Sequence, residues 1–182
     1  MARNLRKFDT YNDYETAELV RPAVSLVVSP RKVYFDPINP TPPTPTFDGK
    51  WKATYSDSHT ESAQCDASST ISSGEINKTN LVSVEIGDCV TTIKTAALQR
   101  CTNLTNITIG SGITNMAAYA ISYNYNTTSL TINATTPPII DPSSLYSTNN
   151  CQIYVPNGSV DAYKSAPIWS QYASRIQPIP NS

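Results

Sequence analysis

Apolar residues recur at a fixed interval in the second half of the chain. Residues 81–103 read LVSVEIGDCVTTIKTAALQRCTN and residues 104–126 read LTNITIGSGITNMAAYAISYNYN, so their apolar positions align at an offset of 23 residues. A period in the twenties is typical of a solenoid in which each coil contributes one short strand. The alternation of apolar and polar residues predicts three strands stacked in a parallel ladder, carrying Val84/Ile86, Ile107/Ile109 and Leu130/Ile132.

The third unit of the repeat, SLTINATTPPII, follows at a longer interval. Its Leu130 lies 26 residues after Leu104. We therefore expect a short insertion in the preceding loop, YNYNTTS (123–129). Gly87 and Gly110 follow the first two strands, where a glycine suits a tight corner.

The segment before the repeats has the period of a strand. In FDGKWKATYSDSHTESAQC (47–65), Trp51, Ala53 and Tyr55 alternate with polar residues, and SDSH offers a turn. This pattern predicts a β-hairpin. The single histidine, His59, falls in the turn and has no catalytic constellation beside it, so we interpret it as a solvated loop residue.

The closing segment, CQIYVPNGSVDAYKSAPIWSQYASRIQPI (151–179), is dense in aromatic residues. Asn157 is suited to cap a short helix there. A short solenoid has an open apolar end, and its terminal repeats must differ in order to cover that end. We therefore expect this segment to be a lid whose aromatic side chains lie in the core: Tyr163, Trp169 and Tyr172.

The N-terminal part of the chain is set apart by a proline-rich stretch. Residues 36–46 contain five prolines, which predicts an extended, semi-rigid spacer. Within residues 1–35, PAVSLVV (22–28) and KVYF (32–35) are expected to be short strands. Their apolar side chains pack either in a partner subunit or on the C-terminal domain. The candidate anchor residues are Phe8, Tyr11, Tyr14, Leu19, Val24, Leu26, Val28, Val33, Tyr34 and Phe35.

Composition narrows the classes of function. The net charge is -1 and only 15% of the residues are charged, which argues against binding to nucleic acid or to an anionic membrane. The first residues are not followed by the apolar run of a secretory signal. The chain is therefore expected to stay in the cytoplasm where it is made, unless it leaves by another route. In that compartment free thiols are favoured over disulfides for its four cysteines, and a zinc site is not expected. The cysteines are Cys65, Cys89, Cys101 and Cys151.

No motif for catalysis is present, so we expect neither an enzyme, nor catalytic residues, nor a cofactor or metal. The acidic residues are scattered along the sequence. Either they are solvated surface residues, or two of them are brought together by the fold as a glycosidase-like carboxylate pair. One loop combines aromatic and amide side chains that could stack on a sugar and bond to its hydroxyls. It is either a glycan contact or an ordinary loop between repeats, and its residues are Tyr123, Tyr125 and Asn126.

The repeats resemble the BspA-type leucine-rich repeat. LTNITIGSGITNMAAYAI has the strand, glycine and small-residue turn of that family, and TAALQRCTNL keeps Cys101 and Leu104 but has Leu98 where phenylalanine is usual. The closing CQIYVP…SVDAYK…W…YASRI is similar to the end of such domains. The resemblance covers about residues 47–179. It implies a mainly β fold, a short leucine-rich-repeat-like β-solenoid with a small C-terminal helical cap.

A second resemblance concerns residues 1–35, which are similar to N-terminal segments of virion proteins of crAss-like phages of Bacteroidales. It implies an extended anchor on a phage capsid or another virion protein. The expected order is an anchor (1–35), a Pro-rich linker (36–46), a hairpin cap (47–80), repeats (81–150) and a C-terminal cap (151–182).

We accordingly expect a non-enzymatic virion protein, assembled in the host cytoplasm as a head fibre or capsid decoration. It would self-associate as a dimer or trimer and present the solenoid to a host surface glycan or protein. The alternative is a bacterial cell-surface adhesin or protein-binding module with the same solenoid. A carbohydrate-active enzyme is a third possibility, which no visible constellation supports.

Overall fold

The computed structural model describes residues 47–148 and 151–180, all of them within the unit Pro43–Ser182. The predicted anchor residues, from Phe8 to Phe35, and the predicted linker lie outside the described residues.

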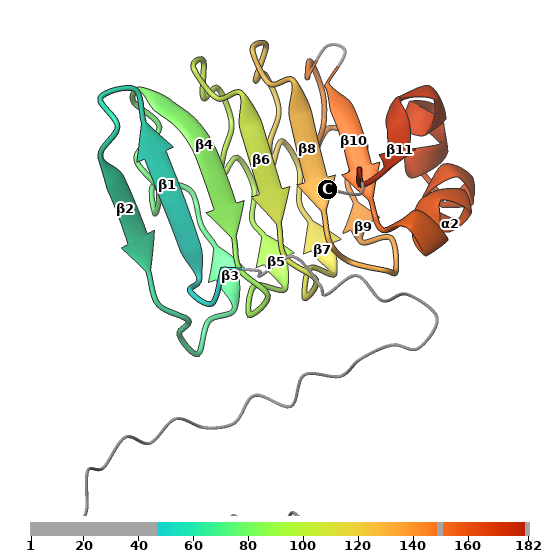
Figure 1. Cartoon of the computed structure of the whole chain (residues 1–182), viewed down its shortest axis with the longest axis horizontal. Coiled ribbons are helices and arrows are strands. Elements are labelled where there is room, and N and C mark those ends of the chain that lie inside the picture. Colours follow the sequence, from blue (N-terminus) through green and yellow to red (C-terminus); the bar gives the residue numbers. More distant parts are fainter. Residues whose placement is uncertain (1–46, 149–150, 181–182) are drawn as a thin grey trace, which may run out of the picture. The chain divides into compact units, whose positions relative to one another are not determined.

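Two sheets wind together into a solenoid (Figure 1). The larger has 7 strands in the order β11-β10-β8-β6-β4-β1-β2, and the smaller has 4 in the order β3-β5-β7-β9. The strands are β1 (Trp51–Tyr55), β2 (Thr60–Ala63), β3 (Thr70–Ile71), β4 (Leu81–Ile86), β5 (Thr92–Ile93), β6 (Asn106–Ile109), β7 (Asn115–Met116), β8 (Ser129–Ile132), β9 (Ile139–Ile140), β10 (Gln152–Val155) and β11 (Ile176–Pro178). The helical elements are η1 (Asn157–Ser159), α2 (Val160–Ser165) and η2 (Trp169–Arg175).

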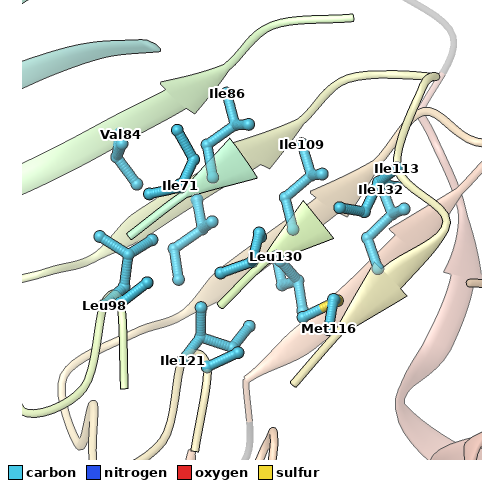
Figure 2. Close-up of a cluster of buried hydrophobic side chains, with 14 of the residues drawn as sticks. Ile71, Val84, Ile86, Leu98, Ile109, Ile113, Met116, Ile121, Leu130 and Ile132 are labelled. Atoms are coloured by element: carbon cyan, nitrogen blue, oxygen red, sulfur yellow. The ribbon is translucent and has the colours of Figure 1, made fainter. Parts of the chain in front are cut away.

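The predicted parallel ladder is confirmed. Strand β6 lies between β4 and β8, and equivalent residues face one another, so that Ile109 pairs with Ile86 on one side and Ile132 on the other. These side chains form a row in the core (Figure 2). Each core side chain of these strands therefore packs against the equivalent side chain of the next coil.

The expected insertion before the third unit is wrong. Leu130 pairs with Ile107, which keeps the interval of the first two strands. The counterpart of Leu104 is Thr127, a buried residue whose Oγ1 donates a hydrogen bond to the carbonyl of Leu104 at 2.9 Å. The polar residue at an otherwise apolar position disguised the true register, and the loop 123–129 has no extra residues.

Each coil has three sides. One side is a strand of the larger sheet, the second is a two-residue strand of the smaller sheet, and the third is a turn. Ile71 and Met116 enter the core from the smaller sheet, whereas Leu98 and Ile121 enter it from the turns (Figure 2). All four are almost completely buried, so the three sides share one apolar core.

The corner glycines are required by close packing between neighbouring segments. A Cβ atom on Gly87 would collide with the backbone carbonyl of Gly49, and one on Gly112 would collide with that of Asp88. In the described chain only Gly74 combines glycine with a positive φ. The tight approach of adjacent backbones, rather than an unusual backbone conformation, therefore excludes side chains from these corners.

The predicted hairpin covers the first coil. β1 pairs antiparallel with both β2 and β4, and Trp51, Ala53 and Tyr55 face the core. Lys50, just before β1, is only 4% exposed and its Nζ lies 2.9 Å from Asp66 and 2.7 Å from Glu75. Burial lowers the pKa of Lys50, but the hydrogen bonds and charges of these two carboxylates outweigh it and hold the pKa above its usual value.

The expectation of four free thiols is wrong. Cys65, after β2, and Cys89, after β4, form a disulfide with a Cα–Cα distance of 6.1 Å. The hairpin folds back onto β4 and so brings together two cysteines that the sequence separates by 24 residues. Cys101 and Cys151 are free and buried, and burial raises the pKa of each thiol to about 11.

The C-terminal segment is the predicted lid. Tyr163 is fully buried and Trp169 is 1% exposed, and their rings meet edge to face at 5.2 Å. Tyr163 donates its hydroxyl to the carbonyl of Ala134, and Trp169 donates its indole N–H to that of Pro138. Both carbonyls belong to the last full coil, so the lid is fastened by polar as well as apolar contacts.

Two details of this lid differ from the expectation. Tyr172 is only half-buried, with the guanidinium of Arg175 4.8 Å from its ring centre. Asn157 does not cap the helix: it is the first residue of the 3-10 turn η1, and α2 begins after Ser159 without a side-chain cap. The short 3-10 turn that directly follows Pro156 moves the N-cap position of the helix from Asn157 to Ser159.

Replacing Asn124 with leucine is expected to lower the free energy of unfolding by about 2 kcal/mol. The Asn124 side chain is fully buried; it accepts the N–H of Cys101 at 2.8 Å and donates to the carbonyls of Leu98 and Ile121 at 2.9 Å. Leucine would leave these groups unpaired. Urea unfolding followed by circular dichroism would measure the change, with the exposed Asn115→Ala as the control; equal stability of the two variants would contradict the expectation.

Candidate binding surface

The turns of successive coils are joined by backbone hydrogen bonds. Arg100 donates its N–H to the carbonyl of Ser122 at 3.0 Å, and Tyr123 donates to the carbonyl of Tyr146 at 2.9 Å. These bonds stack the turns, with Arg100 and Tyr123 as counterparts in successive coils. The third residue of that column is Ser147, next to Tyr146, because Ile139 of β9 pairs with Asn115 of β7 and so lies one residue further along than the strand interval would place it. Side chains on the turns are thus placed by the same repeat that places the core.

Several turn residues have left-handed backbone conformations although they are not glycines. The φ angle is 61° at Arg100, 57° at Tyr123 and 55° at Tyr119. Such a conformation carries a cost of about 1–2 kcal/mol per residue for residues with a Cβ. The stacked turns impose it here, and it fixes the direction in which these side chains leave the solenoid.

Four tyrosines gather on the turn side: Tyr119, Tyr123, Tyr125 and Tyr146, which together with Arg100 we term the tyrosine surface. Tyr123 is at its centre, with ring centroids at 6.4 Å from Tyr119, 6.3 Å from Tyr125 and 5.4 Å from Tyr146. The outer three rings are 40%, 53% and 55% exposed, respectively. An exposed group of aromatic rings held at fixed positions is a candidate binding site.

A comparison with known protein families shows which family this domain belongs to. Residues 69–167, more than half of the chain, match the BspA type leucine rich repeat region, with 6 copies of the repeat. The chain belongs to this family. No curated protein matches the sequence. Leucine-rich repeat domains of this type are typically protein-binding or adhesin modules rather than enzymes, and the predicted mainly β repeat fold is confirmed.

The predicted contact residues of the BspA-type domain are close together but differ in setting. Tyr123 is half-buried at the centre of the tyrosine surface, and Tyr125 is exposed at its edge. The exposed Asn126 donates its amide N–H to the carbonyl of Thr102 at 2.6 Å, which ties it to the preceding turn. Their role as glycan contacts stays a prediction.

Sequence reasoning missed Tyr119, Tyr146 and Arg100. The repeat contained a signal for Arg100, which precedes Tyr123 by the same interval that separates paired residues of β4 and β6. Tyr146 lies beside that column, because an extra residue between β8 and β9 makes Ser147 the counterpart of Tyr123. The counterpart of Tyr119 in the preceding coil is Ala96, which is not aromatic and therefore gave no signal.

The outer face of the larger sheet in the BspA-type domain is chemically different. Its central positions are small and polar: Asn106 and Thr108 on β6 lie beside Ser129 and Thr131 on β8. Ser129 donates its hydroxyl to the side chain of Asn106 at 2.8 Å. An aromatic side chain on this face is Tyr154 of β10, so the rings gather on the turns rather than on the sheet.

Other candidate chemistry is accounted for by local contacts. His59 is exposed, stacks on Tyr55 at 4.3 Å, and pairs with Asp57 and Glu61. Across residues 47–148 and 151–180, no three histidine, cysteine or acidic side chains are grouped as a metal site would need. In the same ranges no helix is long and apolar enough to cross a bilayer.

Proposed function

We propose that the solenoid is an adhesion module that binds a glycan through the tyrosine surface. The observation that carries the proposal is the fixed, exposed ring cluster around Tyr123. Sugar rings have apolar faces that stack on aromatic side chains, while their hydroxyls bond to amides and hydroxyls nearby. Tyr125, Tyr146 and Asn126 offer both kinds of contact at one place.

The setting we propose is the outside of a phage particle. The support is the sequence resemblance of residues 1–35, which would anchor the chain to a capsid or another virion protein as a head fibre or decoration. Self-association as a dimer or trimer would multiply weak contacts into useful avidity. The Cys65–Cys89 disulfide favours a working place outside a reducing cytoplasm.

A bacterial cell-surface adhesin is the second candidate, and the same disulfide favours it equally. The two settings can be separated by finding the chain in purified phage particles or in outer-membrane fractions of the host. On the virion proposal, deleting residues 1–35 removes the protein from particles while the solenoid still folds. A truncated chain that still decorates particles would exclude the anchor.

Glycan binding is expected to fall about 10-fold in a Tyr125→Ala/Tyr146→Ala double variant, because each exposed ring contributes about 0.5–1.5 kcal/mol of stacking. Immobilised oligosaccharide arrays with the whole domain as probe would measure it. The matched control is Tyr154→Ala, which removes a tyrosine from the sheet face. Equal binding by both variants, or binding to a protein receptor alone, would contradict the glycan proposal.

A further inference from the structure

We propose that the tyrosine surface is selective for acidic sugars, with Arg100 binding the sugar carboxylate. This inference rests on the proposed function, because it names the class of glycan for the same site. It is carried by the position, the unused hydrogen-bonding capacity and the surroundings of Arg100.

The stacking of the turns places Arg100 beside Tyr123 in the tyrosine surface. Its backbone N–H bonds to the carbonyl of Ser122 at 3.0 Å, and its guanidinium carbon lies 5.5 Å from the ring centre of Tyr123. The guanidinium therefore lies over the ring at the centre of the cluster. A ligand whose ring stacks on the neighbouring tyrosines would have its substituents within reach of this cation.

The side chain of Arg100 is exposed and forms no ion pair in the described chain. The ion pairs among residues 47–148 and 151–180 join Lys50 to two carboxylates and His59 to two others. The contact with Tyr123 is a cation–π contact, which does not use the guanidinium N–H groups as hydrogen-bond donors. Those donors have the spacing that binds a carboxylate with two parallel hydrogen bonds.

Charged residues are distributed unevenly between the two ends of the tyrosine surface. The turn segment 94–103 carries Lys94 and Arg100 and no acid, and the segment 117–126 carries no charge. In the last coil Asp141 accepts the N–H and hydroxyl of Ser143 at 2.9 and 2.6 Å, and these hydrogen bonds lower its pKa. The surface is therefore cationic at the Arg100 end, and the anionic Asp141 belongs to the coil of Tyr146, at the opposite end.

This asymmetry predicts the orientation of the ligand. The carboxylate of an acidic sugar would lie at Arg100, one sugar face would stack on the tyrosines, and a neutral part of the chain would extend toward Tyr146. A carboxylate at the other end would meet the negative Asp141 instead. Neutral sugars would still stack, but without the charge-assisted hydrogen bonds.

The test uses paired probes that differ only in charge: galacturonate oligomers, sialyllactose and a hyaluronan tetrasaccharide, each with its methyl-esterified form. At least one acid is expected to bind about 10-fold more tightly than its ester, and the preference should weaken as salt rises. Arg100→Gln should remove the preference, so that each acid and its ester bind with equal affinity. Lys94→Gln is the matched control, since it removes an exposed positive charge from the same coil.

The outcomes separate the two proposals. Acids and esters bound equally, or the same loss in Arg100→Gln and Lys94→Gln, would overturn acidic selectivity while glycan binding stands. Failure of every probe to bind at millimolar concentration would overturn both. A preference for acids that Arg100→Gln abolishes and Arg100→Lys restores only in part would support the bidentate contact, because lysine supplies charge without the planar pair of donors.

Discussion

Replacing Trp169 with alanine is expected to lower the free energy of unfolding by about 3–5 kcal/mol. Trp169 is 1% exposed and packs against Tyr163, and its indole N–H is bonded at 2.7 Å to the carbonyl of Pro138. Alanine would leave a cavity in the lid and an unpaired carbonyl in the last coil. Chemical denaturation monitored by circular dichroism would give the change.

The matched control is Lys164→Ala, an exposed position of the same lid, for which we expect a change within about 0.5 kcal/mol. Trp169→Phe should be intermediate, because it keeps most of the apolar contact and loses the hydrogen bond. If Trp169→Ala and Lys164→Ala unfolded at the same denaturant concentration, the segment would not be the lid of the solenoid.

Removing the disulfide by the double substitution Cys65→Ser/Cys89→Ser is expected to lower the free energy of unfolding by about 3 kcal/mol. The bond closes a loop with a sequence separation of 24 residues, so its loss allows the unfolded chain many more conformations. The variant should unfold about 10 °C below the parent protein. Thermal unfolding with and without reductant would measure this.

Reductant supplies the internal control. It should lower the melting temperature of the parent protein and have little effect on the double variant. Thiol titration of the denatured parent protein should find the two free cysteines, Cys101 and Cys151, and two more after reduction. Four reactive thiols without reductant, in protein exposed to air, would show that the pair does not form.

The strands were predictable because their signal is local and repeated. The alternation around Val84/Ile86 and its recurrence around Ile107/Ile109 gave the inner face, the parallel pairing and the register. The same signal failed before Leu130, where a buried Thr127 replaces the leucine of the preceding coil. A hydroxyl that bonds to a carbonyl can occupy a core position, and apolar pattern alone does not identify it.

The disulfide was missed because its geometry depends on the tertiary fold. Cys65 follows the hairpin and Cys89 lies in the corner after β4, so their proximity depends on how the hairpin pairs with β4. The prediction of free thiols rested on the absence of a secretory signal, which carries no information about this geometry. The small-residue corners were located correctly, but the reason lies in adjacent backbones that only the fold brings together.

The candidate site was predictable in part. Tyr123 and Tyr125 stood out as aromatic residues in a polar loop, but no sequence pattern indicates that the turns stack by backbone hydrogen bonds. That stacking turns isolated positions into a surface and adds Tyr119, Tyr146 and Arg100. Alignment of the repeat identifies Arg100 as the counterpart of Tyr123, whereas the rings of Tyr119 and Tyr146 reach Tyr123 only in the folded turns.

The stacking of strands and turns in successive coils has a consequence for how such a protein can change. Adjacent coils are about 4.8 Å apart, so each added coil lengthens the row of turn side chains by one step of that size. Insertion or loss of a whole coil between β4 and β8 would preserve the pairing at both ends, because the hairpin and the lid contact only the terminal coils. The number of rings offered to a ligand could thus vary by duplication of one short stretch of the gene, without any redesign of the core.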